Sequence, residues 1–489
     1  MSAVLDYFRR VRNRQVVRPW ALCAPVVVLI IALPLLRPLR APGDVSENEL
    51  SRLAAIEAYV EHDGAAINDT QFFADLRRET DQAAPPHGSR AVPGAIVVAN
   101  KYYSDRPPVM AYLLSWPYAV MRRLGWDLST NPALVVYVLT MLGVTLPVAG
   151  AAGLIYRMGR MFELKRPYRT GLALSVALGS GLIGYATVLN PHAPAAALVL
   201  SACACLFHVT VARNPTRSGA WLMMSGLCAA FAAVIDLSAA VFLLLLIVVI
   251  LTFRWNWSLR FGGILLYLIG TTPALLMHAA LTVPVTGDLR PGFLHTELAG
   301  VPSPAAASTG TSDELEEGVS PQAPWKIALF RGLDRSLGAL VGSKGLFSHY
   351  PVILIGLLGL ALVLRRHWPA STKAMAAVTL AGAAIIVASY VFLRVDWTQA
   401  MFGPRWFIVF LPLLLFWAGA WLRKTHHKTT WVVAAVLLIF SMTVSILGAA
   451  APFVRATPGQ YTVVAAYRHL VNGEPKRPTT TMQIVDGRP

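Results

Sequence analysis

The sequence is poor in charged residues, and poorest in acidic ones. Only 14% of its 489 residues are charged and 56% are hydrophobic, while 25 acidic residues stand against 42 basic ones, for a formal net charge of +17. A composition this apolar excludes a soluble multidomain protein. We therefore interpret the chain as an all-α polytopic membrane protein that is embedded in the lipid bilayer.

Cysteine is also scarce. Cys23, Cys203, Cys205 and Cys228 all fall within long apolar runs, so the extramembrane segments hold no thiol for a structural disulfide. A glycine-rich phosphate loop and an internal repeat are equally absent from the sequence. These absences disfavour a nucleotide-binding enzyme and a transporter built from two matching halves.

Long apolar runs are abundant. A helix needs roughly 20 apolar residues to cross the hydrocarbon core of a bilayer. About eleven runs meet this requirement, near residues 19–38, 132–156, 169–189, 194–212, 219–235, 237–253, 260–283, 346–364, 374–393, 405–422 and 429–450. The first run lacks a cleavage site followed by a soluble chain, so we expect it to remain as an anchor.

The basic residues sort to one side of these spans. The segment before residue 19 and the links near 157–169, 213–217, 254–260, 365–373 and 423–428 hold 20 basic residues and two acidic ones, Asp6 and Glu163. The positive-inside rule predicts that this side is cytoplasmic, as is the amino terminus, and that the C-terminal tail 451–489 is extracytoplasmic. Because the charge is scattered over short links, nucleic-acid binding is excluded.

Two extracytoplasmic loops of the membrane domain 1–450 are long, at 39–131 and 284–345. Long loops commonly carry function, although the Ser-, Pro- and acid-rich stretch 301–324 is typical of a flexible insert. Leu50, Leu53 and Ile56 recur at helical spacing and predict an amphipathic interfacial helix. A second juxtamembrane helix is expected at 107–124, which lies along the interface because a crossing there would invert every later link.

Four motifs follow one another along the chain: GDVSENELSR (43–52), KYYSDRPPVMAY (101–112), NPHAPAAALVL (190–200) and GPRWFIVFLPLLLF (403–416). In this order they resemble bacterial membrane glycosyltransferases of the GT-C superfamily, in the branch of protein O-mannosyltransferases and lipid A aminoarabinose transferases. The resemblance implies a GT-C-type helical bundle. It also implies an inverting transfer of a sugar from a polyprenyl-phosphate carrier to a protein, lipid or glycan hydroxyl, at the outer face of the bacterial plasma membrane.

Such a transfer needs a base that takes the proton of the acceptor hydroxyl, and a carboxylate at the membrane boundary can serve. Glu49 is the first candidate, because it occupies the acidic position two residues before the family-like Ser51-Arg52 pair. Glu47 and Asp44 are alternatives. A purely structural role, in which the acid only caps a helix, also fits the sequence.

The departing lipid phosphate needs positive charge rather than a proton. Arg106 is the best candidate by resemblance, with Lys101 and Arg405 as helpers, although Arg405 also suits an interfacial snorkelling side chain. Arg52 and Tyr103 are further candidates for substrate binding.

Asp105 has three candidate roles: to orient Arg106, to contact the sugar, or to ligate a divalent cation. Some relatives bind a metal through the equivalent acid together with histidines, so His192 and His349 are candidate metal partners and substrate-binding residues. Relatives tend to have an aromatic-Ser-Pro turn where this chain has Ser348-His349-Tyr350-Pro351. This departure leaves the role of His349 open.

Two other functions remain alternatives. A transporter or flippase of a lipid-linked sugar would place charges at the middle of the membrane, and a non-catalytic scaffold would not depend on these acids and bases. Asp236 lies between two apolar runs, where an ion pathway is conceivable but a solvated turn is the commoner reading.

Overall fold

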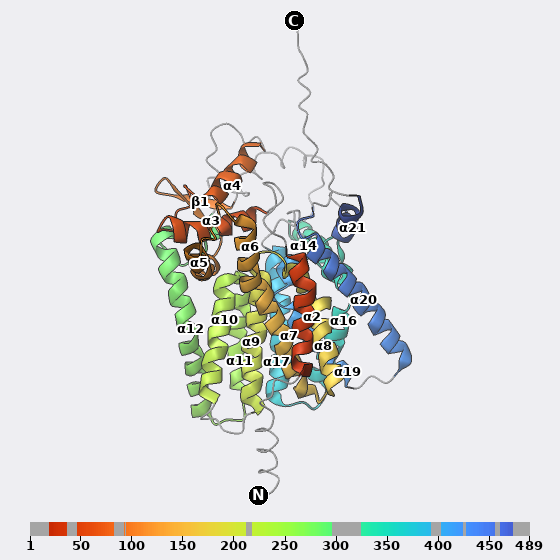
Figure 1. Ribbon diagram of the computed structural model, residues 1–489. Coiled ribbons are helices and arrows are strands. Elements are labelled where there is room, and N and C mark those ends of the chain that lie inside the picture. Colours follow the sequence, from red (N-terminus) through yellow and green to blue (C-terminus); the bar gives the residue numbers. More distant parts are fainter. Residues whose placement is uncertain are drawn as a thin grey trace.

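The fold is a bundle of membrane helices covered at one end by a layer built from the long loops. The computed structural model describes residues 19–36, 46–82, 92, 94–211, 218–295, 324–392, 402–423, 427–454 and 460–472. The bundle stands upright in Figure 1, and the covering layer lies above it. This layer contains α3 (Glu47–Glu61), α4 (Gln71–Gln82), α5 (Pro108–Arg123) and a hairpin of β1 (Ala95–Val98) and β2 (Lys101–Ser104).

Helices dominate because the apolar runs offer no partner for their backbone groups other than their own carbonyls. The bundle consists of α2 (Pro19–Leu35), α6 (Pro132–Thr140), a π-helical turn (Met141–Thr145), α7 (Leu146–Met158), α8 (Arg166–Gly179), α9 (His192–Val211), α10 (Gly219–Ile235), α11 (Ala240–Leu251), α12 (Trp257–Thr286), α16 (Ile353–Arg365), α17 (Ala370–Phe392), α18 (Leu411–Phe416), α19 (Ala418–Leu422) and α20 (Lys428–Ala450). Shorter helices α14 (Pro324–Val341), α15 (Leu346–His349) and α21 (Thr462–Asn472) lie beside its upper end.

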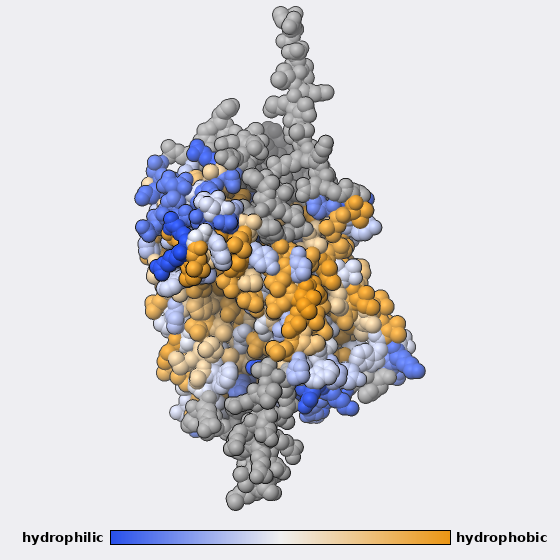
Figure 2. Space-filling model, viewed as in Figure 1, coloured by the Kyte–Doolittle hydropathy of each residue, from blue (hydrophilic) through white to orange (hydrophobic). Residues whose placement is uncertain are grey.

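The bundle has the surface of a membrane protein. Figure 2 shows a band of apolar side chains around its middle and polar residues above and below that band. Among the described residues, five helices are long and apolar enough to cross a membrane, or six if a pair bent by 94° counts as one, and four apolar helices are shorter. The membrane character of the fold is thus confirmed, while the number of eleven crossings stays a prediction.

The described links 157–165, 254–256 and 366–369 lie at the end of the bundle opposite the covering layer (Figure 1). Arg423, which follows α19, forms a 2.5 Å ion pair with Glu163 between α7 and α8 and lies over the ring of Trp368 between α16 and α17. Three links that the charge pattern assigns to one side are therefore neighbours in space. Helix α5 lies across the top of the bundle, as expected of an interfacial helix.

Two expectations about local structure were wrong, and one element was not expected. The runs 169–189 and 405–422 are not continuous helices: α8 ends at Gly179, and 3-10 turns form at Ile183–Tyr185 and Arg405–Phe407. Glycines with positive φ, Gly181 and Gly403, lie at these interruptions. Irregular backbone is tolerated there because it is buried in protein rather than in lipid. The β-hairpin was not anticipated, since its four-residue strands are too short for a clear alternating pattern.

Helix α3 also differs from the expected amphipathic interfacial helix. Its residues from Glu49 to Ala58 are all buried, polar side chains included. Ser46 caps its amino terminus by accepting a hydrogen bond from the backbone N–H of Glu49. Since α4, α5 and the hairpin surround it, α3 is the core of the covering layer rather than its edge.

Close helix packing depends on glycine at several contacts. A Cβ atom at Gly359 of α16 would overlap the carbonyl oxygen of Trp417, and one at Gly226 of α10 would overlap that of Tyr267. Small residues let helix backbones approach in this way when no hydrophobic driving force operates between helices in lipid.

We expect Gly359→Ala to destabilise the protein by about 1–3 kcal/mol, because the added methyl group forces α16 away from the chain around Trp417. Gly171→Ala in α8 is the matched control, since a Cβ there meets no atom within 4 Å. Thermal unfolding of the purified protein in detergent measures both. Equal melting temperatures for the two variants would contradict the packing described here.

Candidate active site

Glu49 lies on the inward face of α3 and is almost completely buried, with 6% of its surface exposed. Its Oε1 accepts a 3.0 Å hydrogen bond from the backbone N–H of Leu189, in the irregular chain between α8 and α9. Burial raises the pKa of Glu49 to about 7, against the opposing effects of that N–H and of Arg52. A carboxyl group of this kind exchanges its proton near neutral pH.

The other two candidate bases are placed differently. Glu47 is exposed in the first turn of α3, where its charge suits the helix amino terminus. Asp44 lies outside the described residues. Of the three acids, Glu49 is therefore the one that the structure describes beside the candidate arginines.

Arg52 lies one turn after Glu49 on the same face of α3 and donates a 2.9 Å hydrogen bond to the carbonyl of Asn48. Among the residues that the structure describes, the charged groups acting on it are Arg106, Asp105, Glu49 and Arg405. Burial, and next the charge of Arg106, lower the pKa of Arg52 to about 9, so it remains positive at neutral pH. Segments far apart in the sequence thus bring three guanidinium groups and two carboxyl groups within electrostatic range.

Arg106 and Asp105 follow β2 directly. Arg106 Nε and Asp105 Oδ1 lie 2.8 Å apart, although the two atoms are not aligned for a hydrogen bond. The second long loop covers this pair: the N–H of Phe293 donates to the carbonyl of Asp105 at 2.8 Å, and a Cβ at Gly292 would lie 3.0 Å from the same oxygen. Both long loops therefore meet at the Asp-Arg-Pro-Pro motif.

A chain of hydrogen bonds fixes the position of Arg106. Its backbone N–H donates to the hydroxyl of Ser104 at 3.2 Å, Ser104 and Ser51 share a 2.6 Å bond, and Ser51 donates to the carbonyl of Gly94 at 2.6 Å. Ser51 of the Ser-Arg pair thus anchors the hairpin to α3, while Arg52 faces the candidate site. Sequence reasoning missed this division of roles.

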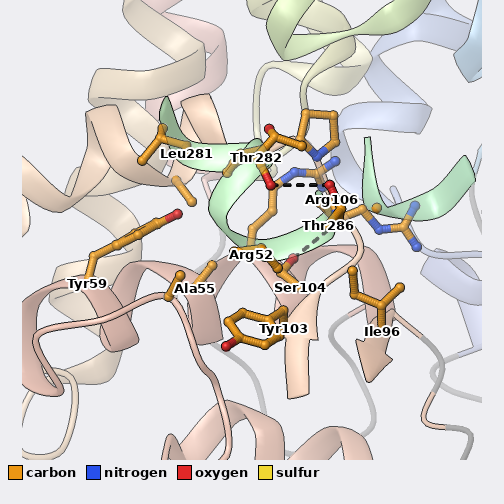
Figure 3. Close-up of a pocket in the computed structure, with 16 residues that line it drawn as sticks. Arg52, Ala55, Tyr59, Ile96, Tyr103, Ser104, Arg106, Leu281, Thr282 and Thr286 are labelled. Atoms are coloured by element: carbon orange, nitrogen blue, oxygen red, sulfur yellow. Dashed lines mark hydrogen bonds between the residues drawn. The ribbon is translucent and has the colours of Figure 1, made fainter. Parts of the chain in front are cut away.

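An open pocket of about 490 Å³ lies between α3, the hairpin and α12. Figure 3 shows Arg52 and Arg106 beside Thr282 and Thr286 of α12, with Tyr59, Tyr103 and Ile96 nearby. The wall of the pocket also includes Ala55, Ala111, Leu281 and Val285. The pocket therefore combines two guanidinium groups with an apolar lining, and Tyr103, a candidate for substrate binding, is part of its wall.

Arg405 is buried at 6% exposure in the 3-10 turn that precedes α18, and its guanidinium carbon lies 4.7 Å from the centre of the Trp406 ring. Arg405 is therefore an interior side chain and does not extend to the membrane surface as a snorkelling arginine would. Lys101, in contrast, is exposed where the hairpin turns, paired with Val98, and does not join the other candidate residues.

The two candidate histidines bind other partners. His192 begins α9, and its Nδ1 lies 2.6 Å from Oδ2 of Asp236. The expectation of a solvated Asp236 was wrong, because this acid is buried at 6% exposure and also accepts hydrogen bonds from Ser238. His349 is fully buried and bonds to Thr462 and Gly345.

These placements bear on the metal hypothesis. Neither histidine is bonded to Asp105, and the described part of the chain contains no group of three or more His, Cys, Asp or Glu side chains able to hold a metal ion. We derive no step that uses a metal.

The pKa of Glu49 has a consequence for stability. Between pH 4.5 and about 7 the unfolded carboxyl group loses its proton while the folded one keeps it, so folding becomes less favourable as the pH rises through this window. We expect Glu49→Gln to stabilise the protein at pH 8 by on the order of 3 kcal/mol and to have little effect at pH 4.5. Thermal unfolding of both proteins across this range measures the effect. A gap that does not change with pH would show that Glu49 titrates normally.

Searches of protein-family models and of curated proteins gave no match. Solved structures did match. The apo oligosaccharyltransferase of Archaeoglobus fulgidus is 11% identical, with a TM-score of 0.50, over 90% of this chain and 57% of its own. ArnT of Cupriavidus metallidurans in the apo state is 13% identical, with a TM-score of 0.47, over 92% of this chain and 77% of its own.

The present chain thus spans little more than half the length of the archaeal oligosaccharyltransferase and nevertheless follows it along most of its own length. At this identity the likeness concerns the fold. The bundle, the two covering loops and the order of the elements agree with the prediction made from the four sequence motifs. The chain therefore shares its overall fold with the archaeal oligosaccharyltransferase.

Proposed function

We propose that the protein is an inverting glycosyltransferase that moves a sugar from a polyprenyl-phosphate carrier to an acceptor hydroxyl at the outer face of a bacterial plasma membrane. The acceptor is a protein, lipid or glycan. The single observation that carries this proposal is a buried carboxyl group with a pKa of about 7, Glu49, one helical turn from the buried Arg52, on which the charges of Arg106 and Arg405 also act.

Buried charge of one sign is costly unless a partner neutralises it. Around Arg52, three guanidinium groups stand against Glu49 and Asp105, and Glu49 is only partly ionised at neutral pH. Arg52 and Arg106 both line the pocket, and arginine is well suited to phosphate because its planar group donates two parallel hydrogen bonds.

The proposed reaction follows from these groups. The acceptor oxygen attacks the anomeric carbon of the donor sugar as its proton passes to the carboxylate of Glu49. The bond between that carbon and the phosphate oxygen breaks, and the lipid monophosphate leaves with both electrons of the bond. Arg106, Arg52 and Arg405 stabilise the charge that develops on the phosphate. Asp105 holds Arg106 through their 2.8 Å ion pair.

The pocket suits a donor that remains in the membrane. One wall of the pocket belongs to α12. Only 22% of the most apolar stretch of this helix is buried within the protein, the lowest share among the five helices long enough to span a membrane in the described part of the chain. Leu265 and Leu276 of this helix are 59% and 62% exposed. A polyprenyl tail can therefore lie along α12 in lipid while its phosphate reaches Arg52 and Arg106.

We expect Glu49→Gln to lower sugar transfer by at least about 100-fold, because a general base typically contributes 10²- to 10⁴-fold. The assay offers the purified protein a panel of radiolabelled polyprenyl-phosphate sugars with membrane extract as the acceptor source. Glu57→Gln is the matched control. Glu57 is on the same helix, only 5% of its surface is exposed, and burial raises its pKa to about 7 as well. Its Oε1 instead accepts from the N–H of Gln71, in the contact with α4. Equal losses in both variants would remove Glu49 from the mechanism.

Transfer by the wild-type protein should rise with pH and level off above about pH 7, because the base acts only after losing its proton. The residual activity of Glu49→Gln should not rise with pH in this range. Rates measured from pH 5 to 9 at low donor concentration decide the matter. A wild-type profile that is flat across pH 7 would rule out a base with this pKa.

We expect Arg106→Ala to lower kcat/KM by more than tenfold, since a charge-assisted hydrogen bond to the departing phosphate is worth about 1.5–3 kcal/mol. Arg123→Ala is the control, because Arg123 is exposed in the last turn of α5. The same transfer assay gives both values. Retention of full activity by Arg106→Ala would argue against its assigned role.

A further inference from the structure

The turn that carries Arg405 is held by hydrogen bonds from three distant parts of the chain. The N–H of Phe402 donates to the carbonyl of Pro452 at 3.0 Å, and the carbonyl of Phe402 accepts from the hydroxyl of Tyr185. The N–H of Gly403 donates to the hydroxyl oxygen of Thr462 at 3.2 Å. Three backbone groups at Phe402 and Gly403 are therefore tied to partners outside the turn, while the carbonyl of Gly403 accepts from the N–H of Arg405 within it.

Thr462, the first residue of α21, connects this turn to His349. Its Oγ1 lies 2.6 Å from His349 Nε2, and His349 Nδ1 lies 2.9 Å from the carbonyl oxygen of Gly345. Both side chains are fully buried. The contact joins α21 to α15 across 113 residues of sequence.

The direction of each hydrogen bond follows from chemistry. The carbonyl of Gly345 can only accept, so His349 carries a hydrogen on Nδ1, and a neutral buried imidazole then has only an acceptor at Nε2. The hydroxyl of Thr462 therefore donates to His349 and accepts from the N–H of Gly403. This arrangement forms a continuous relay from Gly403 through Thr462 and His349 to Gly345, whose carbonyl also accepts from the hydroxyl of Ser348.

The relay acts at a position where the backbone is already constrained. Gly403 has a φ of +60°, and a Cβ there would lie 3.3 Å from Cδ2 of His349. Pro404 follows, whose ring fixes its own φ. The backbone of Gly403 and Pro404 has little freedom to absorb a small shift of Thr462 or His349. Such a shift therefore moves Arg405, the residue after Pro404.

We propose that Thr462 and His349 are positioning residues for Arg405, fixing the turn at residues 402–405 so that the guanidinium group faces the candidate site. This role of His349, which rests on the proposed phosphate-binding role of Arg405, replaces metal or substrate binding as its assignment. It also gives the helix that follows the last membrane span a function at the site.

The first experiment reads the position of Arg405 without any assay of activity. Phenylglyoxal modifies accessible arginines, and mass spectrometry of the Arg405 peptide measures the rate. In the wild-type protein Arg405 should react slowly, since it is 6% exposed. Thr462→Val, which keeps the shape of the side chain but loses both hydrogen bonds, should speed the reaction several-fold, while Thr462→Ser should restore the slow rate.

Thr443→Val is the matched control, because Thr443 is exposed on α20 and its hydroxyl only donates to the carbonyl of Ile439. Labelling of Arg405 should be unchanged in this variant. Should Thr462→Val fail to fold, His349→Gln, which removes the imidazole acceptor, takes its place in the same measurement. A slow, unchanged rate in the variant that folds would overturn the positioning role.

The second experiment is a double-mutant cycle on sugar transfer. Thr462→Val should lower kcat/KM about tenfold in the wild-type background and less than twofold in Arg405→Ala, because residues that act through one group are not additive. Equal losses in both backgrounds would show that Thr462 supports the fold in general. If labelling responds as expected but the wild-type protein transfers no sugar, the proposed function fails while the positioning role stands.

Discussion

The hydrogen bond between the carboxyl group of Glu49 and the backbone N–H of Leu189 joins the covering layer to the membrane bundle. A carboxyl group buried at the core of α3 needs a donor, and a membrane helix has no free N–H groups along its length. The chain between α8 and α9 supplies one by leaving the helical conformation after Gly179. Asn190 satisfies the carbonyls that this break exposes, those of Tyr185 and Val188. The interruption of the third apolar run thus supplies the donor from which the buried acid accepts.

Two arginines reach the site through turns of similar construction. Arg106 precedes Pro107 and Arg405 follows Pro404, and a proline lacks the N–H that would otherwise help to hold such a turn. In both places a nearby backbone N–H donates to a hydroxyl group, that of the partly buried Ser104 or of the buried Thr462. This hydroxyl is bonded to a second side chain, Ser51 or His349, which in turn donates to a backbone carbonyl. Hydroxyl groups suit this task because they donate and accept at once. The two arginines are therefore fixed in position through hydrogen bonds of the backbone in and beside their turns.

Sequence reasoning succeeded where a local pattern carries the information. Apolar runs located the bundle helices, and the spacing of Leu50, Leu53 and Ile56 located α3. The order of the four motifs identified the fold. It failed where the structure depends on contacts between distant segments. His192 with Asp236 and His349 with Thr462 are 44 and 113 residues apart, and isolated polar residues at helix ends carry no signal of their partners. The assigned roles of the site residues remain predictions.

Contacts with distant segments also distinguish the two buried acids of α3, Glu49 and Glu57. Glu49 and Glu57 are eight residues apart on one helix, both are nearly inaccessible to solvent, and burial raises both pKa values to about 7. A raised pKa alone therefore does not identify a catalytic group, because a structural contact such as that of Glu57 with α4 produces the same shift. What distinguishes Glu49 is its neighbourhood. It acts on Arg52, which in turn lies within electrostatic range of Arg106 and Arg405. The proposed reaction needs a group that exchanges a proton close to positive charge, and in the described part of the chain Glu49 and Arg52 meet that requirement one helical turn apart.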